Sequence, residues 1–281
     1  MILSIITINR NNAAGLEKTM RSVASQIGGD FEYVVIDGGS TDGSVEVVRS
    51  FEASFGERLK WISEPDKGIY NAMNKGIEKA SGNYLQFLNS GDSLVSDDVT
   101  MRMTEALKSQ EYPSILYGNM LKDMPGGKAM RDRCFAGREI SFLGFYTGSL
   151  NHPSSYIKKS LFEKYGNYDE SLKIVSDWKW FLQAIILGGE KPVYVDMDVT
   201  LFDMNGISEK SKALAKSERR RVMNELIPPT ILADYDHWAL SIGRMKRLER
   251  HPWANRIVSF LERGLFKVEK RRNRKRGEYE F

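Results

Sequence analysis

Apolar and polar positions alternate in blocks along the first third of the chain. Short apolar runs rich in β-branched or aromatic residues predict buried strands at residues 2–8, 31–37, 59–64 and 84–89. Apolar residues at helical spacing predict helices between them, at residues 13–26, 43–55 and 68–80. Strands and helices that alternate through short connections are typical of a mostly parallel, helix-covered sheet. The pattern therefore predicts an α/β fold.

Each predicted strand ends in polar residues. The four strand ends read Thr7-Ile8-Asn9, Asp37-Gly38-Gly39-Ser40, Glu64-Pro65-Asp66 and Asn89-Ser90-Gly91-Asp92. Ligands of parallel α/β sheets bind at the carboxyl ends of the strands. Because three of the four ends carry a carboxylate and all four are polar, the sequence predicts a ligand site at this edge of the sheet.

The remainder of the chain follows a different pattern. Residues 111–176 are less regular, and residues 176–189 form an apolar helical stretch that Ser176 or Asp177 caps and glycines close. After about residue 205 the chain becomes polar and helical. We therefore expect a helical extension at the C-terminal end of the α/β fold.

Composition places the 281-residue chain among soluble globular proteins, with 41% hydrophobic and 28% charged residues. The single cysteine, Cys134, excludes an intrachain disulfide, which suits a reducing compartment and predicts a cytoplasmic protein. The longest apolar runs, residues 2–8 and 181–187, are far shorter than the roughly 20 residues that a membrane-spanning helix needs. We therefore expect no transmembrane segment.

Net charge is distributed unevenly along the chain. The total is +4, but residues 237–281 hold 13 Lys and Arg against 5 Glu, a net +8 that leaves −4 for residues 1–236. Residues 253–270 carry apolar side chains at helical spacing with Arg and Lys on much of the remaining surface, and the basic run KRRNRKR follows at 270–276. This pattern is typical of an amphipathic helix on an anionic membrane face. A helix packed on the body or on a second subunit fits equally and stays open.

Five motifs, in this order and spacing, resemble those of glycosyltransferase family 2. They are SIITINRNN (4–12), VVIDGGSTDGS (34–44), EPDKGIYNAMNKGI (64–77), YLQFLNSGD (84–92) and SDWKWF (176–181). The resemblance implies a GT-A fold, a Rossmann-like, mostly parallel sheet with helices on both faces. It also implies an inverting enzyme with a nucleotide-diphosphate sugar donor, a divalent metal and a carboxylate base. Bacterial polysaccharide and capsule transferases are the most similar group.

The resemblance also divides the chain. It implies a GT-A catalytic domain at residues 1–210, with a nucleotide-sugar half at about 1–95 and an acceptor and catalytic half at about 96–210. The helical, basic tail at residues 211–281 lies outside it. UDP is the commoner donor base in the family, and GDP remains open. The implied acceptor is a hydroxyl of a glycan or lipid-linked molecule, at the inner face of the cytoplasmic membrane.

The segment Asn89-Ser90-Gly91-Asp92 matches the family's metal motif, which usually holds three carboxylates. Asn89 and Gly91 replace two of them, so the resemblance assigns the metal, Mn²⁺ or Mg²⁺, to Asp92 and donor contacts to Asn89, Ser90 and Asp92. A metal stabilises the charge that develops on a leaving pyrophosphate, since unit charges 4 Å apart interact by about 4 kcal/mol at an effective dielectric of 20. One carboxylate is enough where phosphates and water supply the other ligands. An Asx-type turn is the structural alternative.

The other motifs imply further contacts with the nucleotide sugar. The resemblance assigns such contacts to Thr7, Asn9, Asp37, Ser40, Asp66, Lys67 and Asn74. Asp37 lies in the loop that holds the nucleoside, where relatives commonly carry a second acid at the position of Gly38. Asp66 and Lys67 precede a helix N-terminus, whose free N–H groups attract anions. A strand-to-helix turn is the structural alternative for the Asp37 loop, and a capped, solvated turn is the alternative for Asp66 and Lys67.

Asp177 is the residue that the resemblance assigns as catalytic base. An inverting transfer needs a carboxylate that takes the proton from the acceptor hydroxyl as it attacks, and the family places this acid in an acidic-aromatic motif at a helix start, as in SDWKWF. An ordinary helix N-cap is the alternative for Asp177. His152, in NHPSS, matches a family histidine near the reaction centre and is assigned a contact with acceptor or donor, with a structural histidine as the alternative.

Three other classes of function stay open. A nucleotidyltransferase that makes nucleotide sugars would need a Gly-rich, Arg-containing loop after the first strand, and residues 7–15 lack that spacing. A non-catalytic nucleotide-sugar binder fits the reduced motif at residues 89–92, and donor turnover distinguishes it from an enzyme. A basic adaptor for nucleic acid or membrane would depend on the tail alone. Because no basic stripe and no nucleic-acid module occur outside the tail, we expect no nucleic-acid partner.

Overall fold

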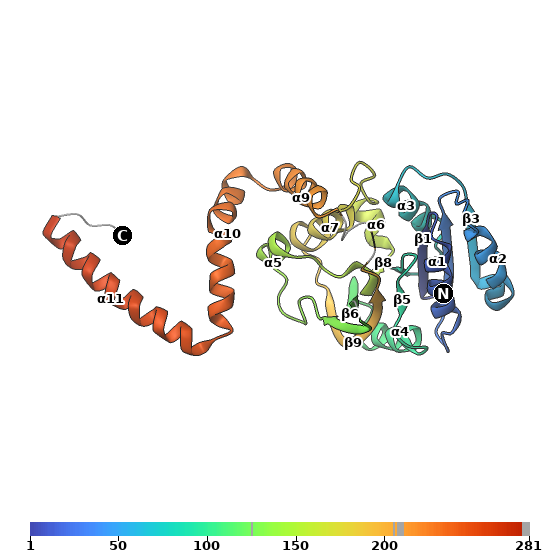
Figure 1. Ribbon diagram of the computed structural model, residues 1–281, viewed down its shortest axis with the longest axis horizontal. Helices are drawn as coiled ribbons and strands as arrows, with labels where there is room; N and C mark the ends of the chain where they lie inside the picture. Colours follow the sequence, from blue (N-terminus) through green and yellow to red (C-terminus); the bar gives the residue numbers. More distant parts are fainter. Residues whose placement is uncertain (125, 205, 207–210, 277–281) are drawn as a thin grey trace. The chain divides into compact units, whose positions relative to one another are not determined.

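The computed structural model describes residues 1–281 except 125, 205, 207–210 and 277–281. The chain divides into two compact units, Met1–Val222 and Met223–Phe281. The first unit contains the sheet, and the described part of the second unit is helical (Figure 1). All candidate site residues named above lie in the first unit.

The predicted alternation of strands and helices is confirmed in the first third of the chain. The elements are β1 (Leu3–Asn9), α1 (Ala13–Ala24), β2 (Phe31–Asp37), α2 (Ser44–Phe55), the 3₁₀ turn η1 (Gly56–Arg58), β3 (Leu59–Ser63), α3 (Ile69–Lys79), β4 (Tyr84–Phe87), β5 (Ser93–Leu94) and α4 (Val99–Ser109). Four of these strands lie parallel in the order β3-β2-β1-β4, with Asn9 opposite Asp37 and Ile6 opposite Phe87. Their carboxyl ends therefore meet at one edge of the sheet.

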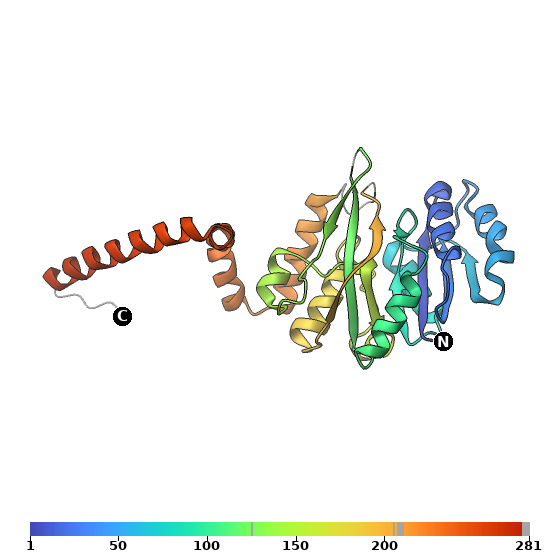
Figure 2. The same cartoon turned by 90° about the horizontal axis from the view of Figure 1, so that it is seen from below.

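Alternate residues of these strands pack on opposite faces of the sheet, as the two-residue period of a strand requires. Leu3 and Ile5 of β1 belong to a core cluster that includes Leu16 and Met20 of α1. Ile6 instead faces α3, and a Cβ atom on Gly76 would lie 2.5 Å from its side chain, so only glycine allows α3 this close to β1. Helices cover both faces (Figures 1 and 2), which explains why the strands are apolar throughout.

The second half of the first unit adds mostly antiparallel strand pairs to the sheet. Its elements are β6 (Ile115–Met124), β7 (Lys128–Asp132), α5 (Phe142–Thr147), the 3₁₀ turn η2 (His152–Ser154), β8 (Ser155–Lys158), α6 (Ser160–Tyr165), α7 (Ser176–Phe181), the π-helix η3 (Leu182–Leu187) and β9 (Val193–Phe202). Among the described residues, nine strands form one sheet in the order β3-β2-β1-β4-β8-β6-β9-β5, with β7 paired to β6. Residues 111–176, where the sequence pattern was less regular, thus supply three of these strands, β6, β7 and β8.

Helices dominate the C-terminal part of the chain, as expected. They are α9 (Lys212–Leu226), α10 (Pro229–Glu249) and α11 (Pro252–Arg276), and the boundary between the two units falls inside α9. Within the described residues, no helix combines the length and the apolarity that crossing a membrane requires.

Candidate active site

The ends of β1 and β2 form a polar cluster around the buried carboxylate of Asp37. Oδ1 accepts hydrogen bonds from the Asn9 amide (2.8 Å) and the Ser40 hydroxyl, and Oδ2 accepts from the Ser40 backbone N–H (2.9 Å) and the Ser63 hydroxyl (2.6 Å). Burial alone would raise the pKa of Asp37, but these hydrogen bonds lower it below its ordinary value. Asp37 is therefore an ionised, rigidly held acceptor, and the structure brings three predicted donor contacts together here.

Asp66 joins this cluster from the end of β3. Its Oδ2 lies 2.1 Å from the point that a Cβ atom on Gly38 would occupy, and its Oδ1 accepts from the Gly68 N–H at 2.9 Å. Arg10 lies 3.8 Å from the same carboxylate. Asp66 thus fills the space next to Gly38, where family relatives commonly carry an acid. Lys67 beside it is exposed, which leaves its ammonium group accessible to an anionic ligand.

The end of β4 forms a second acidic site, around Asp92. The carboxylate is 3% exposed, and its Oδ1 accepts from the backbone N–H of Asp203 at 2.9 Å. β5 pairs with the end of β9 immediately after Asp92, which brings Asp203 beside it. The Asp203 Oδ2 lies 2.8 Å from the Cβ position of Gly91. Burial, reinforced by the charge of Asp203, raises the pKa of Asp92 to about 7.

The oxygen atoms at the end of β4 suit a hard divalent cation. The Asn89 Oδ1 is buried without a hydrogen-bond partner, the Ser90 hydroxyl accepts from Asn12 at 3.3 Å, and two carboxylates stand close together. Buried oxygens of this kind are stabilised by a cation, and Mg²⁺ and Mn²⁺ prefer oxygen ligands. Among the described residues, no three His, Cys, Asp or Glu side chains gather into a ligand group. Two carboxylates fit a metal that shares its coordination with substrate phosphates.

Asp177 lies in the first turn of α7, half-buried, and receives a hydrogen bond from a distant tyrosine. The Tyr70 hydroxyl donates to Asp177 Oδ1 at 2.9 Å. The N-cap of α7 is Val175, and no side chain caps the helix. Asp177 therefore does not serve as the N-cap, and its carboxylate is directed to α3, the helix that follows the Asp66-Lys67 loop.

Three further polar side chains surround Asp177. His152 Nε2 forms a 2.8 Å hydrogen bond with the Tyr168 hydroxyl, and the imidazole stacks on Phe87 at 4.8 Å. Burial lowers the pKa of His152 and raises that of Tyr168, and the charge of Asp177 raises both. Burial lowers the pKa of Arg219, again opposed by Asp177. The charge of Asp177 thus acts on a neutral imidazole (His152), a phenol (Tyr168) and a guanidinium group (Arg219).

Two predicted donor contacts have their polar atoms engaged within the protein. The fully buried Thr7 hydroxyl donates to the Leu88 carbonyl at 2.6 Å and accepts from Tyr33 at 2.9 Å. The Asn74 amide donates to the Tyr168 carbonyl and accepts from the Tyr168 N–H, each at 3.0 Å. These side chains join elements of the fold here, and their contact with a donor stays a prediction.

Sequence reasoning did not single out Tyr70, Asp203, Tyr168 or Arg219. Tyr70 lies inside the quoted motif EPDKGIYNAMNKGI, and Asp203 follows the apolar and acidic run of β9, so each carried a local signal. Arg219 stacks on the Trp178 ring at 5.0 Å from a helix in the tail-like part of the chain, where no pattern marked it. These contacts join segments far apart in sequence, which no local motif encodes.

Comparison with known proteins agrees with this geometry. The family model described as glycosyl transferase family 2 matches residues 4–167, more than half of the chain. An uncharacterized glycosyltransferase of Mycobacterium tuberculosis is 34% identical over 227 residues, which cover 80% of this chain and 83% of that protein. A glycosyltransferase of PGL/p-HBAD biosynthesis from Mycobacterium bovis is 33% identical over 65% of this chain and 69% of its own.

Solved structures show the same fold. S. aureus TarS in complex with UDP-GlcNAc superposes with a TM-score of 0.61 and 20% identity, over 75% of this chain and 61% of that one. The mannosyltransferase PcManGT from Pyrobaculum calidifontis, in complex with GDP-Man and Mn²⁺, superposes with a TM-score of 0.56 and 16% identity, over 70% of this chain and 55% of that one. In the full-length TarS structure the match covers 37% of that chain. Motifs, relatives and architecture agree, and the chain belongs to glycosyltransferase family 2, as a glycosyltransferase with a GT-A fold.

Proposed function

We propose that this chain transfers a sugar, with inversion, from a nucleotide-diphosphate sugar to a hydroxyl of a glycan or lipid-linked acceptor in the synthesis of a bacterial surface glycan. Asp177 takes the proton from the attacking hydroxyl. The 2.9 Å contact between Tyr70 and Asp177 carries the proposal, because it attaches the carboxylate to the helix that begins at the donor loop. A base at this place can reach a hydroxyl that attacks a sugar held at the strand ends.

Asp37 and its neighbours supply the nucleoside contact in this proposal. The carboxylate is ionised and its acceptor sites are filled by four donors, so its role in this proposal is to hold Asn9, Ser40 and Ser63 in place beside the ribose or base. Lys67 supplies a positive charge near the phosphates. TarS binds UDP-GlcNAc and PcManGT binds GDP-Man. Because UDP is the commoner donor base of the resembled family, we favour a UDP-sugar and keep a GDP-sugar as the second choice.

Asp92, Asp203 and the Asn89 amide would hold the divalent metal, Mn²⁺ or Mg²⁺. When bound, the metal would stabilise the negative charge of the leaving diphosphate. The buried, partnerless Asn89 Oδ1 and the closely spaced carboxylates support this assignment. The protein itself fixes Asp92 through the Asp203 N–H and excludes water from the carboxylate.

A nucleotide-sugar panel tests the proposal. UDP, UDP-glucose, UDP-GlcNAc and GDP-mannose are added to the full chain with Mn²⁺ or with EDTA. The melting temperature is measured, together with the release of nucleoside diphosphate as the sugar is transferred to water, which takes the place of the acceptor hydroxyl. A ligand that binds the native state raises the melting temperature by mass action. We expect a Mn²⁺-dependent shift with one donor and release of its diphosphate. A shift without release would favour a non-catalytic binder, and no shift with any donor would contradict both.

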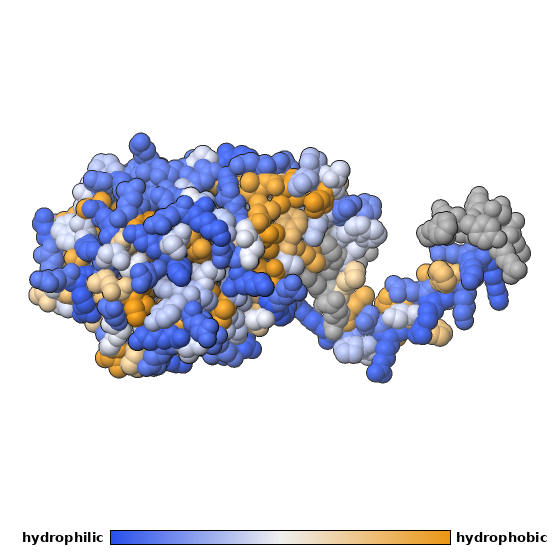
Figure 3. All heavy atoms as spheres, turned by 180° about the vertical axis from the view of Figure 1, so that it is seen from behind, coloured by the Kyte–Doolittle hydropathy of each residue, from blue (hydrophilic) through white to orange (hydrophobic). Residues whose placement is uncertain are grey.

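The C-terminal helix α11 supports a place for the reaction at an anionic membrane surface. Most of its large apolar side chains fall on one stripe and are exposed, with Trp253 at 67% and Phe260 at 71%, whereas Phe266 lies on the polar side. Hydrophilic side chains cover much of this segment, with apolar ones between them (Figure 3). The basic run at 270–276 continues the same helix. An amphipathic helix with a polybasic flank binds anionic lipid through burial of its apolar face and through attraction between its basic residues and the lipid head groups.

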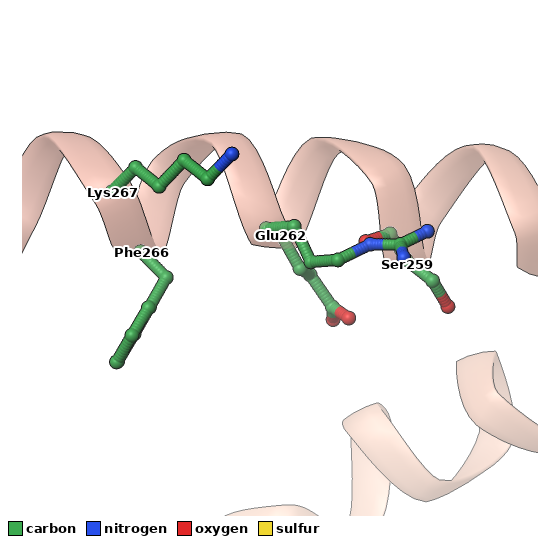
Figure 4. A pocket seen from close by; sticks show the side chains of 5 residues that line it. Ser259, Glu262, Phe266 and Lys267 are labelled. Atoms are coloured by element: carbon green, nitrogen blue, oxygen red, sulfur yellow. The ribbon is translucent and has the colours of Figure 1, made fainter.

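The polar side of α11 does not resemble a ligand pocket. Ser259, Glu262, Arg263, Phe266 and Lys267 line a hollow there, and all five belong to this one helix (Figure 4). Arg263 Nε donates to the Ser259 carbonyl at 3.1 Å, so the guanidinium lies along the helix. A groove along a single helix cannot enclose a nucleotide sugar, which leaves the membrane surface as the partner we favour for this segment.

Liposome binding tests the tail. In the full chain, Ile257→Glu with Leu261→Glu places two charges on the apolar stripe, whereas Asn255→Glu with Ser259→Glu places the same two charges on the polar side. We expect the first pair to abolish sedimentation with vesicles of 30% anionic lipid and the second pair to retain most of it. Equal loss of vesicle binding in both variants would mean that binding depends on the net charge of the helix and not on its apolar stripe. No binding by the wild-type chain would contradict a membrane partner.

A further inference from the structure

The segment that carries Asp177 lacks a regular structure of its own for most of its length. It runs from Gly166 to Asp177, and its residues up to Val175 lie between two six-residue helices, α6 and α7. No side chain caps the start of α7, where Asp177 lies in the first turn. A carboxylate must be held close to its productive orientation to act as a base, and a misplacement of about 1 Å can cost 10²-fold in rate. The supports of this segment therefore come from elsewhere in the fold.

The first support is α3, which contacts the segment twice. The Tyr70 hydroxyl donates to Asp177 Oδ1, and the Asn74 amide bridges the N–H and carbonyl of Tyr168. Tyr70 is buried, and its ring packs against Tyr168 with centroids 5.7 Å apart. Burial, followed by the charge of Asp177 and the hydrogen bond to it, raises the pKa of Tyr70 well above its ordinary value. The phenol therefore stays protonated and remains a donor to the carboxylate.

The second support is α9, which lies beyond the residues that the family model matches. The buried Glu218 carboxylate accepts from two consecutive backbone N–H groups, Lys173 at 2.8 Å and Ile174 at 2.9 Å. Arg219, the next residue, covers the Trp178 ring at 5.0 Å and donates to the Gly148 carbonyl at 3.3 Å. Two neighbouring residues of α9 thus hold the backbone just before Asp177 and the ring just after it.

We propose that Tyr70 and Glu218 are positioning residues that orient the Asp177 carboxylate for proton transfer, Tyr70 through its hydroxyl and Glu218 through the backbone at 173–174. This inference rests on the proposed role of Asp177 as base. Neither residue needs to touch the substrate. The donor-binding α3 and the C-terminal α9 hold the same short segment from two sides, so the base is fixed by elements that lie outside its own motif.

Tyr70→Phe tests the first contact, because it removes one oxygen atom and keeps the ring. The matched control is Tyr165→Phe, since the Tyr165 hydroxyl also donates to a carboxylate, Glu190, at 2.9 Å. The measurement uses the nucleotide sugar that the panel selects and follows release of nucleoside diphosphate. We expect kcat to fall about tenfold for Tyr70→Phe, with KM for the donor unchanged within twofold, and no change in kcat for Tyr165→Phe. Equal kcat values in the two variants would overturn the role of Tyr70.

Glu218→Gln tests the second contact, because the amide retains one acceptor oxygen and turns an N–H donor toward a backbone N–H. The matched control is Val222→Ala, one turn further along α9 at a fully buried position, which lowers stability without removing a hydrogen bond to residues 173–174, because valine has no polar side-chain atom. We expect kcat to fall three- to tenfold for Glu218→Gln and to stay within twofold for Val222→Ala at a matched loss of melting temperature. A parallel loss of kcat in both variants would assign Glu218 a purely structural role.

Combination with Asp177→Asn separates failure of this inference from failure of the proposed function. If Tyr70 and Glu218 act through the base, Tyr70→Phe and Glu218→Gln have no further effect on the residual rate of Asp177→Asn. Additive losses would overturn the positioning role, even with Asp177 as base. If Asp177→Asn itself keeps the wild-type rate, the proposed base is wrong, and the positioning role falls with it.

Discussion

The ends of β2 and β4 carry carboxylates in equivalent places and in opposite electrostatic states. Asp37 is buried among four hydrogen-bond donors, which hold its pKa below the ordinary value. Asp92 is equally buried, accepts from the backbone N–H of Asp203 and lies near a second carboxylate, and its pKa is raised to about 7. The hydrogen bonds to Asp37 outweigh the cost of burying its charge, whereas those to Asp92 do not.

This difference indicates which kind of ligand each carboxylate site suits. A carboxylate whose acceptor sites are all filled by protein donors is a fixed anchor, which holds those donors in place beside a ligand. A buried carboxylate beside a second carboxylate is destabilised without a cation, and it gains stability when a metal binds. In the proposed function, the end of β2 would serve the nucleoside of a nucleotide-diphosphate sugar, and the end of β4 would serve its diphosphate.

Both sites also replace an acid that the family motif usually carries. Gly38 stands where a second acid is common, and the Asp66 carboxylate fills the space that its side chain would occupy. Gly91 likewise leaves room for Asp203. In each case a carboxylate from another segment of the chain takes the place of the missing one. The folded site therefore contains more carboxylates than the local sequence motif.

The largest effect that would sharpen this contrast is that of Asp92→Asn on catalysis. We expect turnover to fall by more than tenfold, and the Mn²⁺-dependent part of the thermal shift with nucleoside diphosphate to disappear, because the amide is a weaker metal ligand. Asp37→Asn serves as the comparison and should keep the Mn²⁺ dependence. Full wild-type activity in EDTA would contradict a metal at Asp92.

The next effect concerns Asp37, where the amide replaces an acceptor of four hydrogen bonds. In Asp37→Asn, at least one donor among Ser40, Ser63 and Asn9 loses its partner, which costs about 1–3 kcal/mol of folding free energy. We expect the Kd of the nucleoside diphosphate to rise about tenfold. Chemical denaturation and calorimetry measure the two quantities, and an unchanged Kd would remove Asp37 from the nucleoside site.

A third effect follows from the raised pKa of Asp92. Its pKa is about 7 in the folded state against an ordinary value of 3.8, so the folded chain binds the extra proton between about pH 4 and 7. The contribution of Asp92 to stability is therefore full below about pH 4 and is lost as the pH rises to 7, by up to about 1.4 kcal/mol per pH unit. Asp92→Asn should remove this slope in metal-free buffer, and identical slopes for both proteins would contradict it.

The smallest effect is that of Ser63→Ala, which removes one of the four donors to Asp37. We expect a loss of about 0.5–1.5 kcal/mol in the free energy of unfolding and a rise of two- to threefold in Kd for the nucleoside diphosphate. The depressed pKa of Asp37 gives the sign of its pH dependence: the stability is present above pH 3.8 and falls as the pH is lowered further. A stability difference that does not shrink in acid would count against this contact.

The sequence predicted the N-terminal half of the fold well, because its signals are local. Apolar runs and helical periods marked β1 to β4 and α1 to α3, and the polar strand ends marked the site edge. The pattern did not mark β6 to β9. Gly118 and Asn119 interrupt the apolar residues of β6, and acidic residues interrupt those of β9, which is mostly of intermediate exposure. A strand whose apolar residues are interrupted gives only a weak strand signal in the sequence.

The candidate site divides in the same way between local and distant signals. Asp37, Asp92 and Asp177 lie in short motifs and could be selected from them. Tyr70 touches Asp177 across more than a hundred residues, and Asp203 reaches Asp92 through the pairing of β5 with β9. Partners of this kind depend on the folded sheet, so a single sequence gives their identity but not their contact.

The central claim is that Asp177 is the base of a sugar transfer, and one substitution tests it most directly. Asn caps helices as well as Asp does, and Val175 holds the N-cap position, so Asp177→Asn should leave the fold intact. We predict that kcat falls by roughly 10²–10⁴-fold, the usual contribution of a positioned base, while the Kd of the nucleoside diphosphate stays unchanged within twofold. Turnover of Asp177→Asn near the wild-type value, with donor binding intact, would contradict the account.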